Sequence, residues 1–363
     1  MKPFTGSYQL DDVQFLLTPL AIPNTPIAQK EALIQSGKQH YSQLLSHESA
    51  PTAEYLALFH RAMALNQQRV AEHIINLAGQ INQAKTGELT LVSLARAGTP
   101  IGVLLKHVLQ TYFQRKLAHY SISILRDVGV DANALRYIIK AHAPESIVFV
   151  DGWTAKGVIA KQLSTSLQEF SKTDGIHIEP DLAVLSDLCG AARFSASYED
   201  YLIPSSLLNA TVSGLISRTV YNDQLSAPDD FHGCLYYQEF AQHDLSAYFI
   251  ETLLKTIDTL WQNCPTNGLG DVSKREHYQI IAQNFIAQLS QHYGVTHANY
   301  IKLGIGEATR VLLRREARCL LLRDEHAEAT AHLRFLANSK AIPIALIPNS
   351  PYQAVALIQE ITL

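Results

Sequence analysis

The sequence predicts an α/β protein whose main domain is a parallel sheet with helices on both faces. Between residues 87 and 190, short apolar runs alternate with helix-like stretches, in the order strand, helix, strand, helix. The same alternation returns after residue 300. Apolar residues make up 47% of the 363 residues and charged residues 17%, which suits several buried cores and excludes a disordered chain.

Four regions are expected along the chain. They are a helical N-terminal region over 1–86, the sheet domain over 87–225, a helical extension over 226–295 and a small α/β domain over 296–363. The N-terminal helix is predicted from apolar residues at helical spacing, namely Leu56, Phe59, Met63, Val70, Ile74 and Leu77.

In the sheet domain, aliphatic and β-branched runs predict strands at 89–94, 120–125, 146–150 and 182–185. Helices are expected between them. The first begins with Thr99 as its cap and Pro100 in its first turn, the second runs from the cap Asp131 to Ala141, and the third covers 157–170. Because parallel strands end at one edge, a ligand site is expected in the loops that follow them.

The remaining chain is predicted to hold more helices and a second alternating unit. Helices are expected at about 245–262 and 274–292. The C-terminal domain is expected to contain a helix from about 306, a strand at 318–323, a helix at 326–338, a strand at 342–347 and a helix at 352–360.

Charge and cysteine content limit the class of protein. A net charge of −4 gives no general attraction to nucleic acid, so any such site must be a local basic patch. The cysteines at 189, 234, 264 and 319 are far apart, which favours reduced thiols over disulfides or zinc. The polar N-terminus and the lack of roughly 18 successive apolar residues predict a cytoplasmic protein without a membrane partner. The oligomeric state stays open.

One candidate binding loop follows the predicted strand at 146–150. Asp151 ends that strand, and Thr154, Lys156 and Gly157 lead into the next helix. A helix N-terminus carries unpaired N–H groups and a partial positive charge, which suit a phosphate. Thr154 and Lys156 can add a hydroxyl donor and a charge, while Asp151 can accept hydrogen bonds from sugar hydroxyls. The loop 151–157 is therefore expected to bind a ribose phosphate.

A second candidate loop covers 95–99. Its small residues let the backbone approach an anion closely, and the guanidinium of Arg96 can bind it in a bidentate manner. We expect both loops to meet at the same sheet edge. Two such anion sites would suit a sugar with a phosphate at one end and a diphosphate at the other.

The segment around Asp151 resembles the phosphoribosyl-diphosphate motif of type I phosphoribosyltransferases. In that motif a hydrophobic strand leads to an acidic pair and then to Thr-Ala. Thr154 and Ala155 match the Thr-Ala and Asp151 matches the second acidic residue. Val150 stands in place of the first acidic residue, and Lys156 replaces a glycine. The loop 95–99 is similar to the diphosphate loop of the same enzymes.

Four longer segments, 93–102, 119–126, 149–154 and 209–219, together resemble a bacterial family carried with tellurite-resistance and stress operons. This family is known both as phosphoribosyltransferase-like and as cysteine protease StiP. The resemblance extends over nearly the whole chain and implies a sheet domain of the type I phosphoribosyltransferase fold.

The resemblance also implies an activity. Type I enzymes transfer ribose phosphate from phosphoribosyl diphosphate to a nitrogen acceptor, with Mg²⁺ bound through the diphosphate. The acceptor, a small molecule or RNA, is not identified. Catalytic roles would fall on Asp151, Arg96, Arg126 and Arg218. The phosphorylated sugar would be bound by Ala97, Gly98, Thr99, Gly152, Thr154, Ala155, Lys156 and Gly157.

The C-terminal domain carries a second motif. Gly304, Glu307, Thr309 and Arg310 resemble the motif of the Pelota-type RNA-binding domain, in which two polar residues usually contact bases. Because Ile305 and Gly306 replace that polar pair, we expect recognition of RNA shape or backbone rather than of bases.

Basic residues continue along the same predicted helix. Arg310, Arg314 and Arg318 are spaced by four residues and are expected to share one helix face. We expect Gly304, Gly306, Glu307, Arg310 and Arg314 to form the RNA-binding site, although a solvated basic helix has the same pattern.

Two other functions remain open. A non-catalytic sensor of ribonucleotides or RNA would explain the missing acidic residue at Val150. A cysteine protease would need Cys189, or less favourably Cys234, with His232 as its base and Asp187 or Asp230 to orient the imidazole. Trp153 can either stack on an acceptor base or pack beneath its loop.

Overall fold

The computed structural model describes residues 2–36, 44, 46–221, 227, 229–263 and 272–360. In this part of the chain no helix is both long and apolar enough to cross a bilayer.

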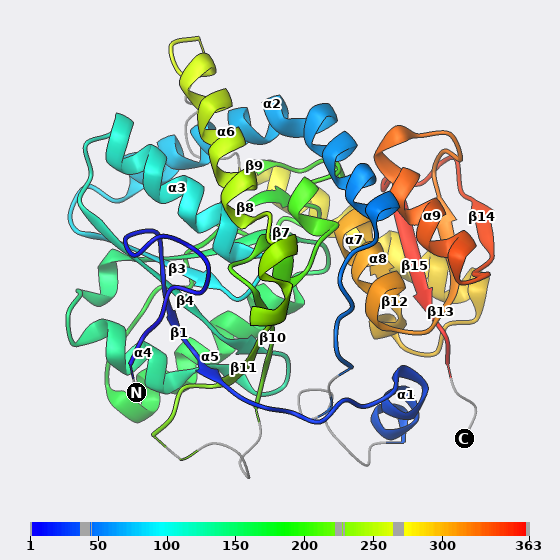
Figure 1. Cartoon of the computed structure of the whole chain (residues 1–363), viewed down its shortest axis with the longest axis horizontal. Coiled ribbons are helices and arrows are strands. Elements are labelled where there is room, and N and C mark those ends of the chain that lie inside the picture. Colours follow the sequence, from blue (N-terminus) through cyan, green and yellow to red (C-terminus); the bar gives the residue numbers. More distant parts are fainter. Residues whose placement is uncertain are drawn as a thin grey trace.

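The main domain is built on a six-stranded sheet (Figure 1). In spatial order its strands are β1 (Gln14–Leu16), β4 (Leu117–Ile122), β3 (Leu89–Leu94), β7 (Ile147–Thr154), β8 (Leu182–Asp187) and β9 (Phe194–Ser197). Every neighbouring pair is parallel, which confirms the predicted fold class. The chain passes from β3 to β4 on one side and then to β7 on the other, so the strand order reverses between β3 and β7. Ligands of open parallel sheets bind at such a reversal.

Helices cover both faces because side chains alternate along the strands. Val148 and Val150 of β7 belong to the core beneath α2 (Ala53–Ala84) and α3 (Gly98–Tyr112). Phe149, between them, belongs to the opposite core, which α4 (Ala132–Ile139) and α5 (Val158–Asp174) cover. The helix α6 (Ser246–Leu260) adds to the first core through Phe249 and Leu253.

Smaller elements complete the main domain. They are the helix α1 (Ile27–Gln35), the sheet of β2 (Thr18–Pro19), β10 (Ile216–Val220) and β11 (Gly233–Tyr236), and the pair β5 (Ile124–Leu125) and β6 (Gly129–Val130). The residues of β1 were expected in a helical region, but their backbone pairs with β4 at the sheet edge.

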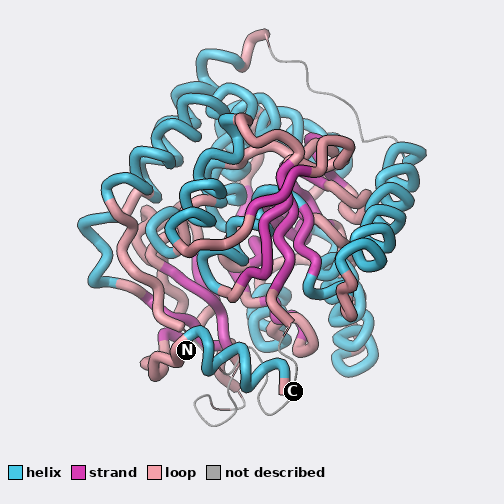
Figure 2. Tube along the Cα trace, turned by 90° about the vertical axis from the view of Figure 1, so that its right-hand side faces the viewer, coloured by secondary structure: helices cyan, strands magenta, loops and turns pink. Residues whose placement is uncertain are grey.

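The C-terminal domain has its own sheet (Figure 2). Its order is β12 (Ile301–Leu303), β15 (Ala354–Ile358), β13 (Ala317–Leu322) and β14 (Ile344–Leu346). The helices α8 (Gly304–Arg314) and α9 (Ala331–Ser339) contribute to the core shared with the main domain, and α7 (Val272–Tyr293) precedes β12.

The prediction of a helix at 352–360 was wrong, because this segment contains β15, an interior strand of that sheet. All five residues of β15 are buried. Ala354, Ala356 and Ile358 face one core and Val355 and Leu357 face the other. A strand buried on both faces shows no polar alternation, so a short apolar run does not distinguish it from a helix.

Two predicted boundaries near the candidate site were also wrong. The strand β7 does not end at Asp151 but continues to Thr154, which pairs with Asp187 of β8. The helix α3 begins at Gly98, one residue before Thr99, and Thr99 does not cap it. The Thr99 hydroxyl is instead buried and hydrogen-bonded to Ser121 Oγ at 2.8 Å. Asp131, by contrast, caps α4 as predicted, by accepting from the N–H groups of Asn133 and Ala134.

Candidate functional site

The two loops predicted at the sheet edge lie in direct contact. A Cβ added to Gly98 would lie 2.1 Å from the carbonyl oxygen of Val150, and one added to Gly152 would lie 3.4 Å from that of Ala97. Glycine at position 98 is therefore required by the close approach of the two backbones. This contact fixes the end of β7 against the start of α3, at the reversal of strand order.

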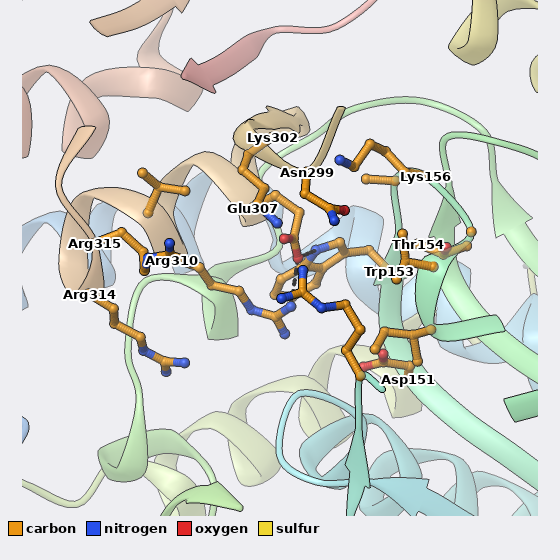
Figure 3. Close-up of a pocket in the computed structure, with 16 residues that line it drawn as sticks. Asp151, Trp153, Thr154, Lys156, Asn299, Lys302, Glu307, Arg310, Arg314 and Arg315 are labelled. Atoms are coloured by element: carbon orange, nitrogen blue, oxygen red, sulfur yellow. Dashed lines mark hydrogen bonds and ion pairs between the residues drawn. The ribbon is translucent and has the colours of Figure 1, made fainter. Parts of the chain in front are cut away.

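A cavity of about 280 Å³ opens beside the end of β7 (Figure 3). One wall is the main domain, with Asp151, Thr154, Lys156 and the start of α5. The other wall is the C-terminal domain, with β12 and α8. Residues predicted for a sugar site and residues predicted for an RNA site therefore share one cavity between the two domains.

The cavity is strongly cationic. Its basic side chains are Arg126, Lys156, Lys302, Arg310, Arg314 and Arg315, and its carboxylates are Asp151 and Glu307. Such an excess of positive charge in a partly enclosed space attracts polyanions such as phosphate esters. Among the residues that the structure describes, no group of three or more acidic, histidine or cysteine side chains could hold a metal ion.

The pKa values of the lining groups reflect this crowding. Burial, together with the charge of Lys302, lowers the pKa of Lys156 to about 7. Burial raises the pKa of Asp151 to about 6, although Arg310 opposes the shift. Burial also disfavours the charge of Glu307, but Arg310 and Lys302 outweigh it and lower the pKa of this carboxyl. Lys156 is thus a cation that burial destabilises and that an anion would stabilise.

Trp153 joins the two walls by packing against the C-terminal motif. The guanidinium of Arg310 lies 4.4 Å from its ring centre, and its indole N–H donates to Glu307 at 3.3 Å. A Cβ on Gly306 would lie 2.4 Å from the ring, so only glycine fits beneath it. Trp153 therefore packs in the domain interface, and the motif residues Gly306, Glu307 and Arg310 face inward.

The other motif residues have separate roles. Gly304 has a φ of +82° and packs against Leu188 and Asp200 of the main domain. Arg314 is bound to Asn209 and lies 3.6 Å from Glu48. Arg318 does not share the face of Arg310 as predicted, because α8 ends at Arg314 and Arg318 lies in β13.

The loop 95–99 does not turn its arginine toward the cavity. Arg96 donates to Glu48 at 2.7 Å and to Asn209. The carboxylate of Glu48 also accepts from Ser217 Oγ at 2.6 Å and from the N–H of Ala210 at 3.1 Å. Arg96 and Ala97 instead border a separate space of about 20 Å³.

Two further arginines were predicted to take part in catalysis, Arg126 and Arg218. Arg126 lines the cavity and forms an ion pair with Asp127 at 3.1 Å, whereas the side chain of Arg218 lies outside the described residues. Lys302 and Arg315, which were not among the predicted site residues, also line the cavity, and Arg315 directly follows the predicted Arg314. Lys302 lies between the buried Ile301 and Leu303 in a short strand that was not predicted. The alternation of apolar and polar residues over 301–303 is the sequence pattern that could have indicated this strand.

The described cysteines show no catalytic pairing. Cys189 Sγ lies 3.7 Å from both Asp187 Oδ1 and Thr154 Oγ1, and no described histidine is hydrogen-bonded to it. Burial and the charge of Asp187 raise the pKa of this thiol to about 12. His232, the proposed base, contacts Ser123 Oγ at 3.0 Å.

Comparison with known proteins places the chain in a family. Residues 6–254 match the family described as tellurite-like stress resistance cysteine protease StiP, and residues 280–360 match the PELOTA RNA binding domain. A protein of Acinetobacter baylyi named cysteine protease StiP is 41% identical over 368 residues, covering 99% of this chain and 95% of the relative.

Among solved structures, a hypoxanthine phosphoribosyltransferase variant of Trypanosoma cruzi, complexed with the product IMP, is similar. The match covers 53% of this chain and 93% of the solved chain, with 14% identity and a TM-score of 0.28. The two sequence matches decide the family: this chain belongs to the StiP family and ends in a Pelota RNA-binding domain.

Proposed function

We propose that this chain is a phosphoribosyl-transferring enzyme that binds a phosphorylated ribose in the cavity between its domains. One observation carries the proposal. Asp151 of β7 and the N-terminus of α5 line one cavity. Six basic side chains line the same cavity, namely Arg126, Lys156, Lys302, Arg310, Arg314 and Arg315. Basic groups suit phosphates, and a carboxylate suits sugar hydroxyls.

The 5-phosphate is assigned to the start of α5. Gly157 is the N-cap of this helix, with a φ of +70°, and as a glycine it has no side chain that could cap the N–H groups of the first turn. These N–H groups and the ammonium of Lys156 would bind the phosphate dianion. Asp151, in the second half of β7, would accept hydrogen bonds from the ribose hydroxyls.

The diphosphate is assigned to the wall of the C-terminal domain. Lys302 and Arg310 line that wall, whereas Arg96 is already bound to Glu48 and Arg315, also in the lining, to Glu31 at 2.7 Å. In the reaction, the bond between ribose C1 and the diphosphate oxygen breaks, and a bond from C1 to a nitrogen acceptor forms. The nitrogen loses a proton to solvent. The basic wall would stabilise the negative charge of the leaving diphosphate.

Mg²⁺ is expected to enter bound to the diphosphate. Asp151 and Glu307 offer the carboxylate oxygens that this ion prefers, and Mg²⁺ is commonly held by one or two carboxylates together with the phosphate oxygens of its ligand. When bound, the ion would neutralise part of the diphosphate charge.

The first test is binding of phosphoribosyl diphosphate with Mg²⁺, measured by titration calorimetry. We expect Asp151→Asn to weaken binding by about tenfold or more, because it removes the negative charge and replaces one of the two acceptor oxygens by an amide donor. Asp324→Asn, a change at an exposed carboxylate of the C-terminal domain, serves as the matched control and should leave affinity unchanged. Equal affinity of the Asp151→Asn protein and the wild type would refute the sugar assignment.

The second test addresses turnover. The wild-type protein is incubated with labelled phosphoribosyl diphosphate and a metabolite extract, and mass spectrometry follows label transfer and diphosphate release. Tight binding without any release would favour the sensor over the enzyme.

A cysteine protease activity, as named for the Acinetobacter baylyi relative, has less support in the geometry. A thiol nucleophile needs a neighbouring base, and Cys189 has Asp187 and Thr154 beside it instead. Peptidase activity that is lost on Cys189→Ala would overturn our order of preference.

An RNA partner is supported by the match of residues 280–360 to the Pelota domain. The motif residues Glu307 and Arg310 line the cavity, so we propose that RNA reaches them through a terminal nucleotide rather than along a duplex. A 5′-terminal nucleotide of RNA carries a phosphate monoester like that of the free sugar phosphate, while its 3-hydroxyl is esterified in the chain.

A further inference from the structure

Asp151 and Glu307 each use one carboxylate oxygen within the protein and leave the other unused. Asp151 Oδ1 accepts from the N–H of Gly152 at 2.7 Å. Glu307 Oε1 accepts from Arg310 at 2.6 Å and from the Trp153 indole at 3.3 Å. Neither Asp151 Oδ2 nor Glu307 Oε2 accepts a hydrogen bond from any described residue, and both side chains line the same cavity.

The two carboxylates come from different domains. Asp151 lies in β7 and Glu307 in the first turn of α8. The charge of Glu307 raises the pKa of Asp151, and Arg310 lowers the pKa of both, so the three groups are electrostatic neighbours. Two neighbouring acceptors in an otherwise cationic space suit a ligand that carries two adjacent hydroxyl donors as well as phosphate.

The strand β7 alone could not supply such a pair. The residue before Asp151 is Val150, which is fully buried in the core under α3. Because strand side chains alternate, a carboxylate at position 150 would point into that core. A second acceptor must therefore come from another element, and Glu307 lies across the cavity.

We propose that Glu307 completes the sugar-binding site, with Asp151 and Glu307 together accepting hydrogen bonds from the two vicinal hydroxyls of a ribose 5-phosphate. This inference rests on the proposed function and narrows the ligand to the ribo configuration. Trp153 and Arg310 hold the Glu307 carboxylate in place through Oε1, so Oε2 is presented without a large loss of side-chain entropy. The Pelota domain thereby supplies part of the sugar site.

The test compares three ligands on the full-length protein by calorimetry: ribose 5-phosphate, 2-deoxyribose 5-phosphate and inorganic phosphate. The wild type should prefer the ribose ester by about tenfold or more, since a charged acceptor loses its partner in the deoxy sugar. Glu307→Gln should reduce this preference several-fold, and Glu307→Ala should bring it close to one. Glu325→Gln, a change at an exposed residue of the same domain, is the control.

Inorganic phosphate separates binding from a merely structural role. Removing a negative charge from the cavity should leave phosphate affinity unchanged or increase it in both Glu307 variants. A structural role would lower the affinity for all three ligands together. Glu307→Ala also removes the ion-pair partner of Arg310 and could therefore unfold the protein. In that case the ribose preference of the isosteric Glu307→Gln protein tests the inference.

The outcomes distinguish the two proposals. A ribose preference that stays at the wild-type value in Glu307→Gln and in a folded Glu307→Ala protein would overturn this inference while leaving the cavity as a sugar-phosphate site. Absence of any sugar-phosphate binding by the wild type would overturn the proposed function, and this inference with it.

Discussion

Lys156 illustrates how a binding site can destabilise the protein that carries it. Its ammonium donates to the carbonyl of Ala298 at 2.6 Å, yet burial and Lys302 lower its pKa from 10.5 to about 7. The folded state therefore holds this proton less tightly than the unfolded state. The resulting penalty is absent above pH 10.5 and grows as the pH falls toward 7. Stability is thus lost at a position where a bound anion would restore it.

We therefore expect Lys156→Met to raise the melting temperature at pH 7, by about 2 °C, and to give less gain at pH 10. The same change should weaken sulfate binding about tenfold at pH 6. Sulfate is the probe because its charge does not change in this range. Wild-type affinity for sulfate should fall as the pH rises through about 6, where Asp151 ionises, and through about 7, where Lys156 loses its proton. Lys156→Met should remove the second part of this fall and leave the first.

The control is Lys161→Met, which alters an exposed lysine on the next turn of α5. It should change neither the melting temperature nor the pH dependence. A lower melting temperature of Lys156→Met at pH 7 would contradict the argument, as would an unchanged pH dependence of sulfate binding.

At the scale of single elements, the position of α8 depends on a carboxylate of the main domain. Asp200 accepts from the N–H of Ile305 at 2.9 Å and from that of Gln353 at 2.7 Å. The first bond caps the start of α8 and the second holds the chain just before β15. Because α8 carries Glu307 and Arg310, Asp200 positions half of the cavity without lining it.

Removing this carboxylate should loosen the domain interface. We expect Asp200→Ala to cost about 3 kcal/mol, because buried N–H groups lose their acceptor. The loss should appear as a lower melting temperature and as faster proteolysis between the two domains. Asp200→Asn keeps one acceptor and should cost less than Asp200→Ala. A loss of about 3 kcal/mol should lower the melting temperature by several degrees. If both variants melt within about 1 °C of the wild type, Asp200 does not hold the domains together.

At the scale of the whole molecule, the sheet domain and the Pelota domain form one site. Ile305, Ala308 and Val311 of α8 belong to the same core as Ile203 and Leu207 of the main domain. The motif face of the C-terminal domain is thus turned toward the main domain, and ligands must enter between them.

This arrangement predicts how RNA should compete for the site. Short single-stranded RNA with a 5′-phosphate should displace bound ribose 5-phosphate from the full-length protein, and the affinity should fall with added salt. The same RNA in circular form has no terminal phosphate and should displace at least tenfold less. Competition is read from displacement of a labelled sugar phosphate. Equal displacement by both RNAs would place RNA on an outer surface instead.

The sequence by itself determined the local features of this protein. The strand at 89–94, the Asp131 cap and the helices around residues 250 and 283 were predicted because hydrophobic period and capping chemistry act over a few residues. Motif spacing also placed Asp151, Lys156, Glu307 and Arg310 among the candidates for binding. All four line the cavity between the domains.

Only the tertiary structure decided how these residues combine. It joined Asp151 and Glu307, 156 positions apart in the sequence numbering, in one cavity, and it turned Arg96 toward Glu48. It also made a strand of 354–358, which is buried on both faces. The hydrophobic period of a segment indicates only which of its own faces is buried. The outcomes above depend on which distant segments pack together, because those contacts bury apolar side chains and pair charges.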